Sequence, residues 1–224
     1  MNRQFNLIGA MVAIGLCLVG AVQAAEFVKI DPPQTASGYL ARLLINENPF
    51  PGERGYVSVA DSKAGMRQVL WVLHGRMHFI PSGYSQSQIC ATRSKDILEV
   101  ITAKRQCEGF FKDAKGKPAM APRVESRLAY LKSIANKGGK PGKFAELLNY
   151  GQGLASAYNT GGMDAADQFA GISKVNSTAV TGRAYSWMTD QDCYKPGGNF
   201  VAIPDAQGGS PGGNRYFTLR KEPK

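Results

Sequence analysis

Proline and glycine divide this chain into short segments, and this division does most to limit what the chain can fold into. The sequence contains 26 Gly and 12 Pro among its 224 residues, without a collagen-like period. Both residue types interrupt regular elements, so many turns and loops are expected. The apolar fraction of 43% is still high enough to bury a sizeable core. The length suits one domain, or one domain with a small appendage.

Between these breaks, apolar residues recur with helical spacing over much of the chain. After an extended lead-in at 25–35, a first helix is expected from a cap at Thr35 or Ser37 to Glu47. A second helix is expected to follow a cap at Asp61 or Ser62. Further helices are expected at 94–105, 122–137, 142–158 and 163–172.

The remaining segments are expected to form short strands and loops. The alternation in Tyr56-Val57-Ser58-Val59 predicts a small early β-hairpin within residues 48–61. Strand-like pieces follow in the Gly/Pro-rich part at 182–224, and two further segments are interpreted as loops. These strand-like pieces are 184–188, 199–203 and 215–219, and the loops are 80–90 and the basic segment 108–121. The expected fold class is therefore mainly α (α+β), with an irregular C-terminal region.

The N-terminus has the pattern of a secretory signal peptide. Arg3 precedes an uncharged run from Leu7 to Val22, and Val22-Gln23-Ala24 forms a small-x-small cleavage site. Cleavage after Ala24 would remove residues 1–24, and no later run is long enough to span a membrane. An uncleaved anchor is the alternative, because the run approaches the length of a transmembrane helix. The expected location is therefore periplasmic or secreted.

The charge balance indicates a polyanionic partner. Twenty-seven Lys and Arg against 17 Asp and Glu give a net charge of +10. Residues 93–143 hold 13 of the cations and only five acids. This basic stretch is interpreted either as a face that holds an anionic polymer or as a solvated surface. Export argues against nucleic acid as the partner and favours peptidoglycan glycan strands or another envelope protein.

Three cysteines follow the signal segment, namely Cys90, Cys107 and Cys193. Two are expected to pair in an oxidising compartment, and Cys90–Cys107 is favoured because it closes a loop of about 17 residues. The odd count leaves Cys193 free, or paired with one of the other two. The chain has no CxxC motif and only two histidines, His74 and His78, so a zinc site is not expected. No cofactor is implied. A Cys–His nucleophile is a less favoured alternative.

Glu47 is the strongest candidate for a catalytic side chain. It lies seven residues after Leu40 and four after Leu43, so it continues the apolar stripe of its helix. It also falls in the last turn, where the helix dipole opposes a negative charge. Burial and the dipole both favour the protonated carboxyl group that a general acid requires. A glutamate at a frayed, exposed helix end is the alternative interpretation.

Two resemblances to known families select the same glutamate. Residues 40–47 (LARLLINE) resemble the helix that ends in the catalytic glutamate of the spore cortex-lytic, cell-wall hydrolase family. Residues 65–77 (GMRQVLWVLHGRM) resemble that family's next helix, although Gly75-Arg76 stands where the family usually has Asn-Arg. Residues 157–162 (AYNTGG) are similar to the Ala-Tyr-Asn-x-Gly motif of lysozyme-like lytic transglycosylases, in which the tyrosine lies beside the catalytic glutamate.

The lytic-transglycosylase resemblance extends to two looser matches. Residues 47–50 (ENPF) and 65–68 (GMRQ) resemble that group's Glu-Ser-x-Phe and Gly-Leu-Met-Gln. Together the resemblances imply a single lysozyme-like domain over residues 36–224. They also imply that Gln68, Tyr158 and Asn159 bind substrate.

Three further residues near Glu47 are candidates. Glu53 is the rival catalytic acid, because Gly52-Glu53-Arg54-Gly55 resembles a Glu-Ala-Arg-Gly string in the hydrolase family; the alternative is a solvated loop acid. Asp61 is either a second carboxylate or the cap of the following helix. Tyr56, in the expected hairpin, is a candidate substrate-binding residue.

The sequence therefore predicts an exported, lysozyme-like enzyme that cleaves peptidoglycan. Glu47 is expected to protonate the glycosidic oxygen, and the enzyme is either a lytic transglycosylase or a hydrolase. The main alternative is a non-enzymatic exported module that binds anionic wall polymer or an envelope protein through its basic face. An interaction or inhibitor protein on a decayed lysozyme-like frame is a third interpretation.

Overall fold

The computed structural model describes residues 26–137, 139–163, 166–189 and 197–222. The predicted signal peptide at 1–24 and Cys193 lie outside the described residues. The fold is mixed α+β, as the sequence predicts, with helices and two small antiparallel sheets. Among the described residues, no helix is both long enough and apolar enough to cross a membrane.

The elements follow one another in an order that puts most helices before most strands. The helices are α1 (Ala36–Asn46), α2 (Val59–His78), α3 (Gln86–Cys90), α4 (Ile97–Ile101), α5 (Pro122–Lys137) and α6 (Lys143–Asn159), with short 3₁₀ turns η1 (Asp205–Gln207) and η2 (Pro211–Gly213). The strands are β1 (Phe110–Lys112), β2 (Pro118–Met120), β3 (Ile172–Val175), β4 (Thr178–Met188), β5 (Phe200–Ala202) and β6 (Arg215–Arg220).

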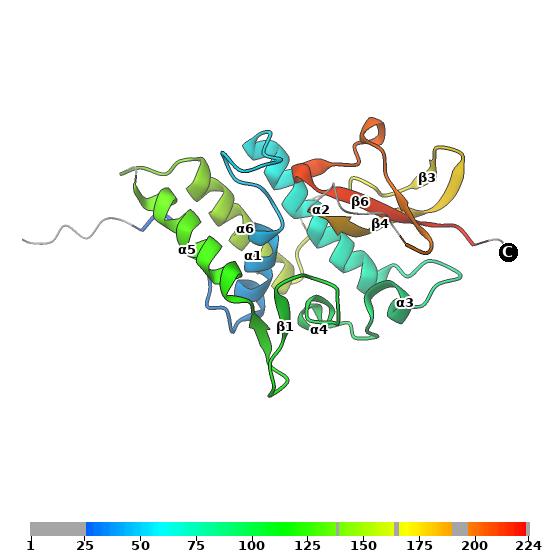
Figure 1. Ribbon diagram of the computed structural model, residues 1–224, viewed down its shortest axis with the longest axis horizontal. Coiled ribbons are helices and arrows are strands. Elements are labelled where there is room, and N and C mark those ends of the chain that lie inside the picture. The colour runs from blue at the N-terminus through cyan, green and yellow to red at the C-terminus, as the bar shows by residue number, and fades with distance from the viewer. Residues whose placement is uncertain (1–25, 138, 164–165, 190–196, 223–224) are drawn as a thin grey trace, which may run out of the picture.

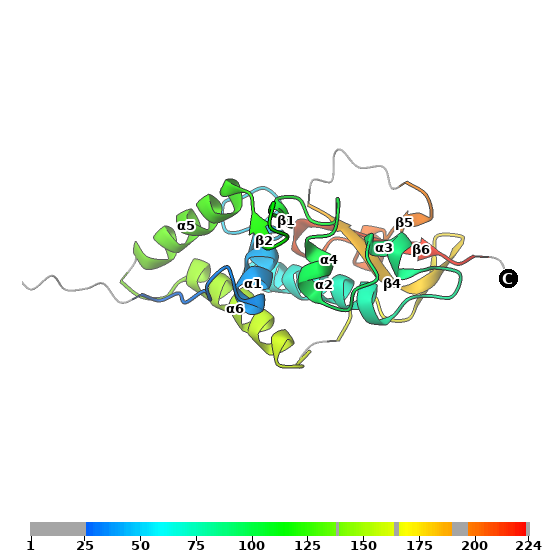
Figure 2. The ribbon, with the colours of Figure 1, turned by 90° about the horizontal axis from the view of Figure 1, so that it is seen from below.

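Helix α2 lies between a helical part and a sheet. Helices α1, α5 and α6 gather at one end of the molecule, and the sheet lies at the other (Figures 1 and 2). The sheet has the strand order β3-β4-β6-β5, with antiparallel pairing throughout. One hydrophobic core joins both parts, because it includes Leu43 of α1, Leu73 of α2 and Tyr216 of β6.

Helix α1 begins and ends where the sequence predicts. The Thr35 side chain accepts a hydrogen bond from the Gly38 backbone N–H at 3.0 Å, which caps the helix start. Glu47 is the C-cap residue. Helix α6 packs closely against α1 at Gly151, where an added Cβ would lie 3.0 Å from Ile45 Cγ1. The absence of a side chain at position 151 therefore permits the close contact between α1 and α6.

The expected early hairpin is wrong. Residues 51–55 form turns, and α2 begins at Val59, inside the segment where a strand was expected. The Ser58 side chain accepts a hydrogen bond from the Asp61 N–H, so Ser58 is the cap rather than Asp61 or Ser62. The four-residue alternation is too short to form a strand without a partner, and a good N-cap prevails.

Three other predicted segments differ from the structure. The basic loop at 108–121 contains the β1–β2 hairpin, and the loop at 80–90 contains α3, which starts with a capping box at Ser85 and Gln88. The helix expected at 163–172 is absent from its described residues, which lead by turns into β3. The C-terminal region is also less irregular than expected, because its predicted strand-like pieces pair into the sheet.

Candidate functional site around Glu47

Glu47 lies where the helical part meets the sheet. It is only 9% exposed, which confirms its predicted place on the buried side of the helix end. Its backbone carbonyl accepts a hydrogen bond from Asn214 Nδ2 at 2.7 Å. This bond ties the end of α1 to the turn before β6, so both parts of the fold fix the position of Glu47.

Two donors at the end of β4 hold the Glu47 carboxylate. Trp187 Nε1 donates to Oε2 at 2.9 Å, and Thr189 Oγ1 donates to the same oxygen at 2.7 Å. Residues two apart on an extended chain point to the same side, which explains why both side chains reach Glu47. Both donors are neutral, so they orient the carboxyl group without supplying a counter-charge.

Arg76 of α2 helps to fix the Trp187 ring. Its guanidinium carbon lies 4.9 Å from the ring centre, within the range of a cation–π interaction. Its Nε donates to the Tyr185 carbonyl at 2.8 Å, and the residue is only 4% exposed. The chain segment that resembles the hydrolase family's second helix therefore supports the aromatic donor to Glu47.

A polar hollow of about 420 Å³ opens beside Glu47. Two arginines, Arg105 and Arg123, line it together with Glu108, and Arg123 pairs with Glu108 at 2.7 Å. The complete lining comprises Asn46, Glu47, Arg105, Gln106, Cys107, Glu108, Arg123, Trp187, Met188 and Thr189.

A second hollow of about 200 Å³ adjoins the first. The two share Asn46 and Thr189, and the second also contains Glu53 and Arg127. We call the two hollows together the Glu47 groove. Its walls come from α1, the turns after α1, the segment before β1, α5 and the end of β4, so segments far apart in the sequence build it.

No protein-family model, curated protein or solved structure matches this chain. An interpretation of the Glu47 groove therefore depends on its geometry and on the motifs in the sequence.

Glycine at position 65 permits a close approach of α2 to Asn48 and to η2. A Cβ at this position would lie 2.1 Å from Asn48 Oδ1 and 2.7 Å from the Cα of Gly212. Tyr216 also donates from its hydroxyl to the Gly65 carbonyl at 3.1 Å. Gly65 is therefore a packing point between α2 and η2 rather than part of the groove lining.

Glu53 has a structural role that the sequence did not predict. It pairs with Arg127 of α5 at 2.6 Å, and its Oε2 also accepts a hydrogen bond from the Phe50 N–H at 2.7 Å. Arg127 in turn donates to the Ile45 carbonyl at 2.7 Å. Glu53 therefore closes its turn and joins it to α5, rather than lying as a solvated loop acid.

Asp61 and Tyr56 both lie outside the Glu47 groove. Asp61 is in the first turn of α2 and lines a different, more open depression together with Asp205 and Ser210. Tyr56 is half-buried and packs against the hydrophobic core. Neither residue lines the Glu47 groove.

Gln68 is buried on the side of α2 that meets the segment before β3. Its Nε2 donates to Asp167 Oδ1 at 3.1 Å, and its Oε1 accepts from the Gln168 N–H at 3.3 Å. Asp167 also pairs with Arg183 at 2.5 Å. Gln68 therefore belongs to a structural network, and it does not line the Glu47 groove.

Tyr158 does not lie in the Glu47 groove, contrary to the transglycosylase resemblance. Its hydroxyl lies 3.2 Å from His74 Nδ1, and burial raises the pKa of Tyr158 to about 12. Asn159 is exposed at the end of α6. His74 and His78 stack with ring centres 4.4 Å apart. Among the described residues, no group of three His, Cys, Asp or Glu side chains could hold a metal ion.

The predicted Cys90–Cys107 disulfide is not formed, because both residues are free and buried. Cys90 Sγ lies 3.3 Å from the Gln86 carbonyl of its own helix, whereas Cys107 lines the Glu47 groove. Burial raises the pKa of the Cys107 thiol to about 12. The thiol therefore stays protonated at neutral pH, which argues against its use as a nucleophile.

The residues that the sequence did not single out are mainly the ones that hold Glu47. Trp187, Thr189 and Asn214 lie 140 to 167 positions after it. The strand-like pattern at 184–188 is the signal that could have found Trp187, but the pattern does not say which element the strand will meet. Such long-range contacts depend on packing rather than on local sequence.

Proposed function

We propose that this protein cleaves the glycan strands of peptidoglycan, with Glu47 as the general acid and base. The observation that carries the proposal is the state of the carboxyl groups in the Glu47 groove. Glu53 and Glu108 are each bound to an arginine, at 2.6 and 2.7 Å. Glu47 instead receives neutral donors on one oxygen and is nearly buried. Among the described carboxyl groups of the groove, Glu47 is therefore the one held by neutral donors, and we assign the role of general acid to it.

The first step uses the oxygen of Glu47 that the two donors do not bind. Trp187 and Thr189 both donate to Oε2, so Oε1 is the oxygen that would carry the proton. Transfer of this proton to the glycosidic oxygen lets the bond from that oxygen to C1 break, with the electron pair going to the leaving sugar. An oxocarbenium-like centre then develops at C1, and the new Glu47 carboxylate lies beside it.

The second step returns a proton to Glu47. In the transglycosylase route the carboxylate takes the proton from the sugar's own 6-hydroxyl, and that oxygen attacks C1 to give a 1,6-anhydro product. In the hydrolase route a water molecule supplies both the nucleophile and the proton. The first route needs no second free carboxylate, and Glu53 and Glu108 are both ion-paired. We therefore favour the anhydro product.

The charges of the groove fit an anionic polymer. Arg105 and Arg123 line the hollow beside Glu47, and both belong to the basic stretch at 93–143. The peptide stems of peptidoglycan carry carboxylates that such cations would attract. Other cations of the stretch are bound elsewhere, as in the pairs Lys112–Glu99 and Lys132–Glu26.

Incubation of the purified protein with purified peptidoglycan tests the proposal. The expected result is the release of muropeptides that end in a 1,6-anhydro sugar, each lighter by one water molecule than the reducing-end product that hydrolysis would give. Products with a reducing end would identify a hydrolase. If no soluble fragments are released, the enzymatic proposal is wrong.

A non-enzymatic binding module is the second candidate. The two arginines beside Glu47 favour it, because they would attract an anionic polymer whether or not a bond is cleaved. Sedimentation of the protein with peptidoglycan, in the absence of any released fragment, would support this candidate.

A further inference from the structure

A second cavity lies on the opposite side of α2 from the Glu47 groove. It has a volume of about 520 Å³ and lies between α2 and α6. Arg67 and Trp71 line it, whereas Arg76, which supports Trp187, is nine residues after Arg67 and therefore about 180° away around the helix. The two cavities share no lining residue. We call this cavity the α2–α6 groove.

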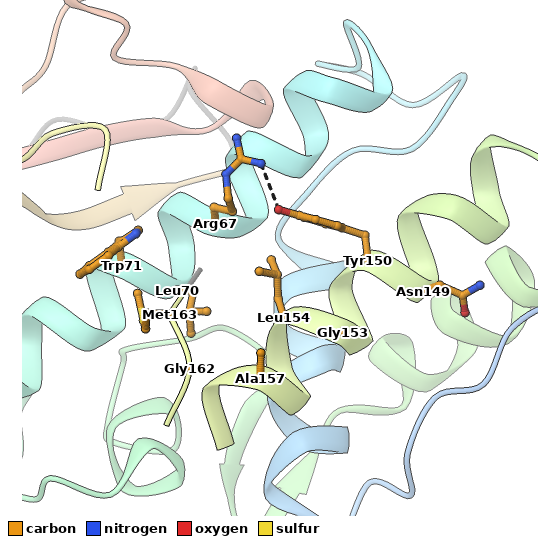
Figure 3. Close-up of a pocket in the computed structure, with 10 residues that line it drawn as sticks. All are labelled: Arg67, Leu70, Trp71, Asn149, Tyr150, Gly153, Leu154, Ala157, Gly162 and Met163. Atoms are coloured by element: carbon orange, nitrogen blue, oxygen red, sulfur yellow. Dashed lines mark hydrogen bonds between the residues drawn. The ribbon is translucent and has the colours of Figure 1, made fainter. Parts of the chain in front are cut away.

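The walls of the α2–α6 groove are apolar except at one end. Leu70 and Trp71 from α2 face Leu154 and Ala157 from α6, and Met163 closes the same space (Figure 3). The volume lies in the range of small-molecule sites, which are mostly apolar with few polar groups. Gly153 leaves part of the wall open, because an added Cβ there would meet no atom within 4 Å.

The polar end of the groove is formed by Arg67 and Tyr150. Arg67 Nη1 donates to the Tyr150 hydroxyl at 3.0 Å, and the two side chains meet across the groove from the two helices (Figure 3). No acidic residue is among the described residues that line this cavity. The groove therefore presents a cation and a phenol at one end of an apolar channel.

The neighbouring cations differ from Arg67 in their partners. Lys63, which lies 5.0 Å from the centre of the Tyr150 ring, pairs with Glu146 at 2.7 Å. Arg183, near Trp71, pairs with Asp167 at 2.5 Å. In the part of the chain that the structure describes, Arg67 has no such carboxylate partner, and its hydrogen bond goes to a hydroxyl. An anionic group of a ligand would complete this end of the groove.

We propose that the α2–α6 groove binds a small amphiphile with an apolar body and one carboxylate head. The carboxylate would lie against Arg67 and the Tyr150 hydroxyl, because an arginine binds a carboxylate through charge-assisted hydrogen bonds. The body would lie along Trp71, Leu154 and Met163. This site is separate from Glu47, so it stands whether or not the protein cleaves peptidoglycan.

Decanoate and 1-decanol are matched probes, because they share a ten-carbon chain and differ in the charge of the head. Calorimetric titration of the full chain should show saturable 1:1 binding of decanoate and much weaker binding of decanol. Arg67→Gln should weaken decanoate binding by about 10- to 100-fold, as expected for the loss of a charge-assisted hydrogen bond. Arg67→Lys keeps the charge but loses the planar fork of donors, so its affinity should lie between those of the parent and Arg67→Gln. Equal binding of the two probes by the parent protein would overturn the assignment of the head.

Substitutions at Gly153 test the location. Gly153→Leu should fill the groove and abolish binding, whereas Asn159→Leu, at the exposed end of the same helix, should leave binding unchanged, since Asn159 does not line the groove. Arg105→Gln is the control for binding of decanoate in the Glu47 groove, which Arg105 lines. This substitution should not change the affinity for decanoate. Undiminished binding by Gly153→Leu would overturn the proposal, as would an absence of saturable binding by the parent.

Methionine methyl resonances give a readout that does not depend on any variant. Decanoate should shift the methyl signal of Met163, which lines the groove, and leave that of Met77 unchanged in the core. A titration that leaves Met163 unshifted would overturn the proposal even if the Gly153→Leu protein does not fold. If the groove binds a protein partner instead, decanoate would leave the methyl signal of Met163 unshifted.

Discussion

The indole N–H of Trp187 donates to the carboxylate of Glu47 at 2.9 Å, across 140 positions of the sequence. One residue ends the first helix and the other lies near the end of the longest strand. Their contact therefore joins the helical part to the sheet at the point where the Glu47 groove opens. A reaction that depends on Glu47 thus depends on the correct docking of these two parts.

Glu47→Gln should abolish glycan cleavage and leave the fold intact. Glutamine keeps an oxygen that can accept from Trp187 and Thr189, but it cannot donate a carboxyl proton. Loss of general acid–base catalysis typically lowers kcat by about 10²- to 10⁴-fold. Release of soluble muropeptides measures the effect. Glu108→Gln is the matched control in the same hollow and should retain activity; the reverse pattern would move the acid to Glu108.

Thr189→Val should lower kcat without a loss of stability. The substitution is nearly isosteric, Thr189 is exposed, and it removes one neutral hydrogen bond to Glu47 Oε2. Such a bond contributes about 0.5–1.5 kcal/mol, which corresponds to a roughly 2- to 10-fold lower kcat. Thr160→Val, at the end of α6, provides the control, since Thr160 does not line the Glu47 groove. Equal activity of the two variants would show that Thr189 does not orient the acid.

Alanine substitutions at Gly151 and Gly153 of α6 should have opposite effects on the free energy of unfolding. Position 153 has room for a Cβ, so Gly153→Ala should stabilise the protein by about 0.5–1 kcal/mol through helix propensity. At position 151 the Cβ would lie 3.0 Å from the buried Ile45 side chain, so overpacking should destabilise by about 1–3 kcal/mol. Urea denaturation measures both. Stabilisation by both variants would mean that α1 and α6 can separate without cost.

Glu53→Gln should destabilise the protein more than Glu108→Gln does. Glu53 is two-thirds buried, pairs with Arg127 and closes its own turn, so loss of its charge should cost about 1–3 kcal/mol. Glu108 has an 89% exposed side chain and an exposed partner, so its substitution should cost less than about 1 kcal/mol. Thermal unfolding of the two variants under identical conditions compares them. Similar losses would contradict the structural role of the Glu53–Arg127 pair.

His74 should make the folded state less stable in acid. Burial lowers the pKa of His74 below its ordinary value of 6.5, and the neighbouring His78 and Arg183 act in the same direction. The unfolded chain therefore binds this proton at a higher pH than the folded chain does. The contribution of neutral His74 to the free energy of unfolding is intact well above pH 6.5. It is lost as the pH falls from about 6.5 through the lower pKa of the folded state.

The His74→Gln variant isolates this contribution. Urea denaturation of the parent and the variant between pH 7.5 and 4.5 should give a shallower decline of stability for the variant. A decline of equal slope in both proteins would assign the acid sensitivity to other groups.

Local sequence was sufficient for the elements whose signals lie within a few residues of one another. Thr35 caps α1 through the Gly38 N–H, and Glu47 ends that helix on the buried side that its spacing from Leu40 and Leu43 predicts. The strand-like pieces near the C-terminus were predictable for the same reason. Helical caps and side-chain periodicity act over three to four residues, or over alternate residues in a strand, so the sequence displays them directly.

Tertiary structure decided what those elements meet. The resemblance at Tyr158 predicts a place beside Glu47, but packing of α6 against α2 brings its hydroxyl to His74. The chemistry of Glu53 was likewise decided by Arg127, which lies 74 positions away on another helix. Because a contact between distant segments depends on how whole helices and sheets pack, no local spacing encodes it. The sequence by itself put Glu47 at a helix end, in line with the apolar stripe of that helix; only the tertiary structure decided that it is buried and supplied Trp187 and Thr189 to hold it.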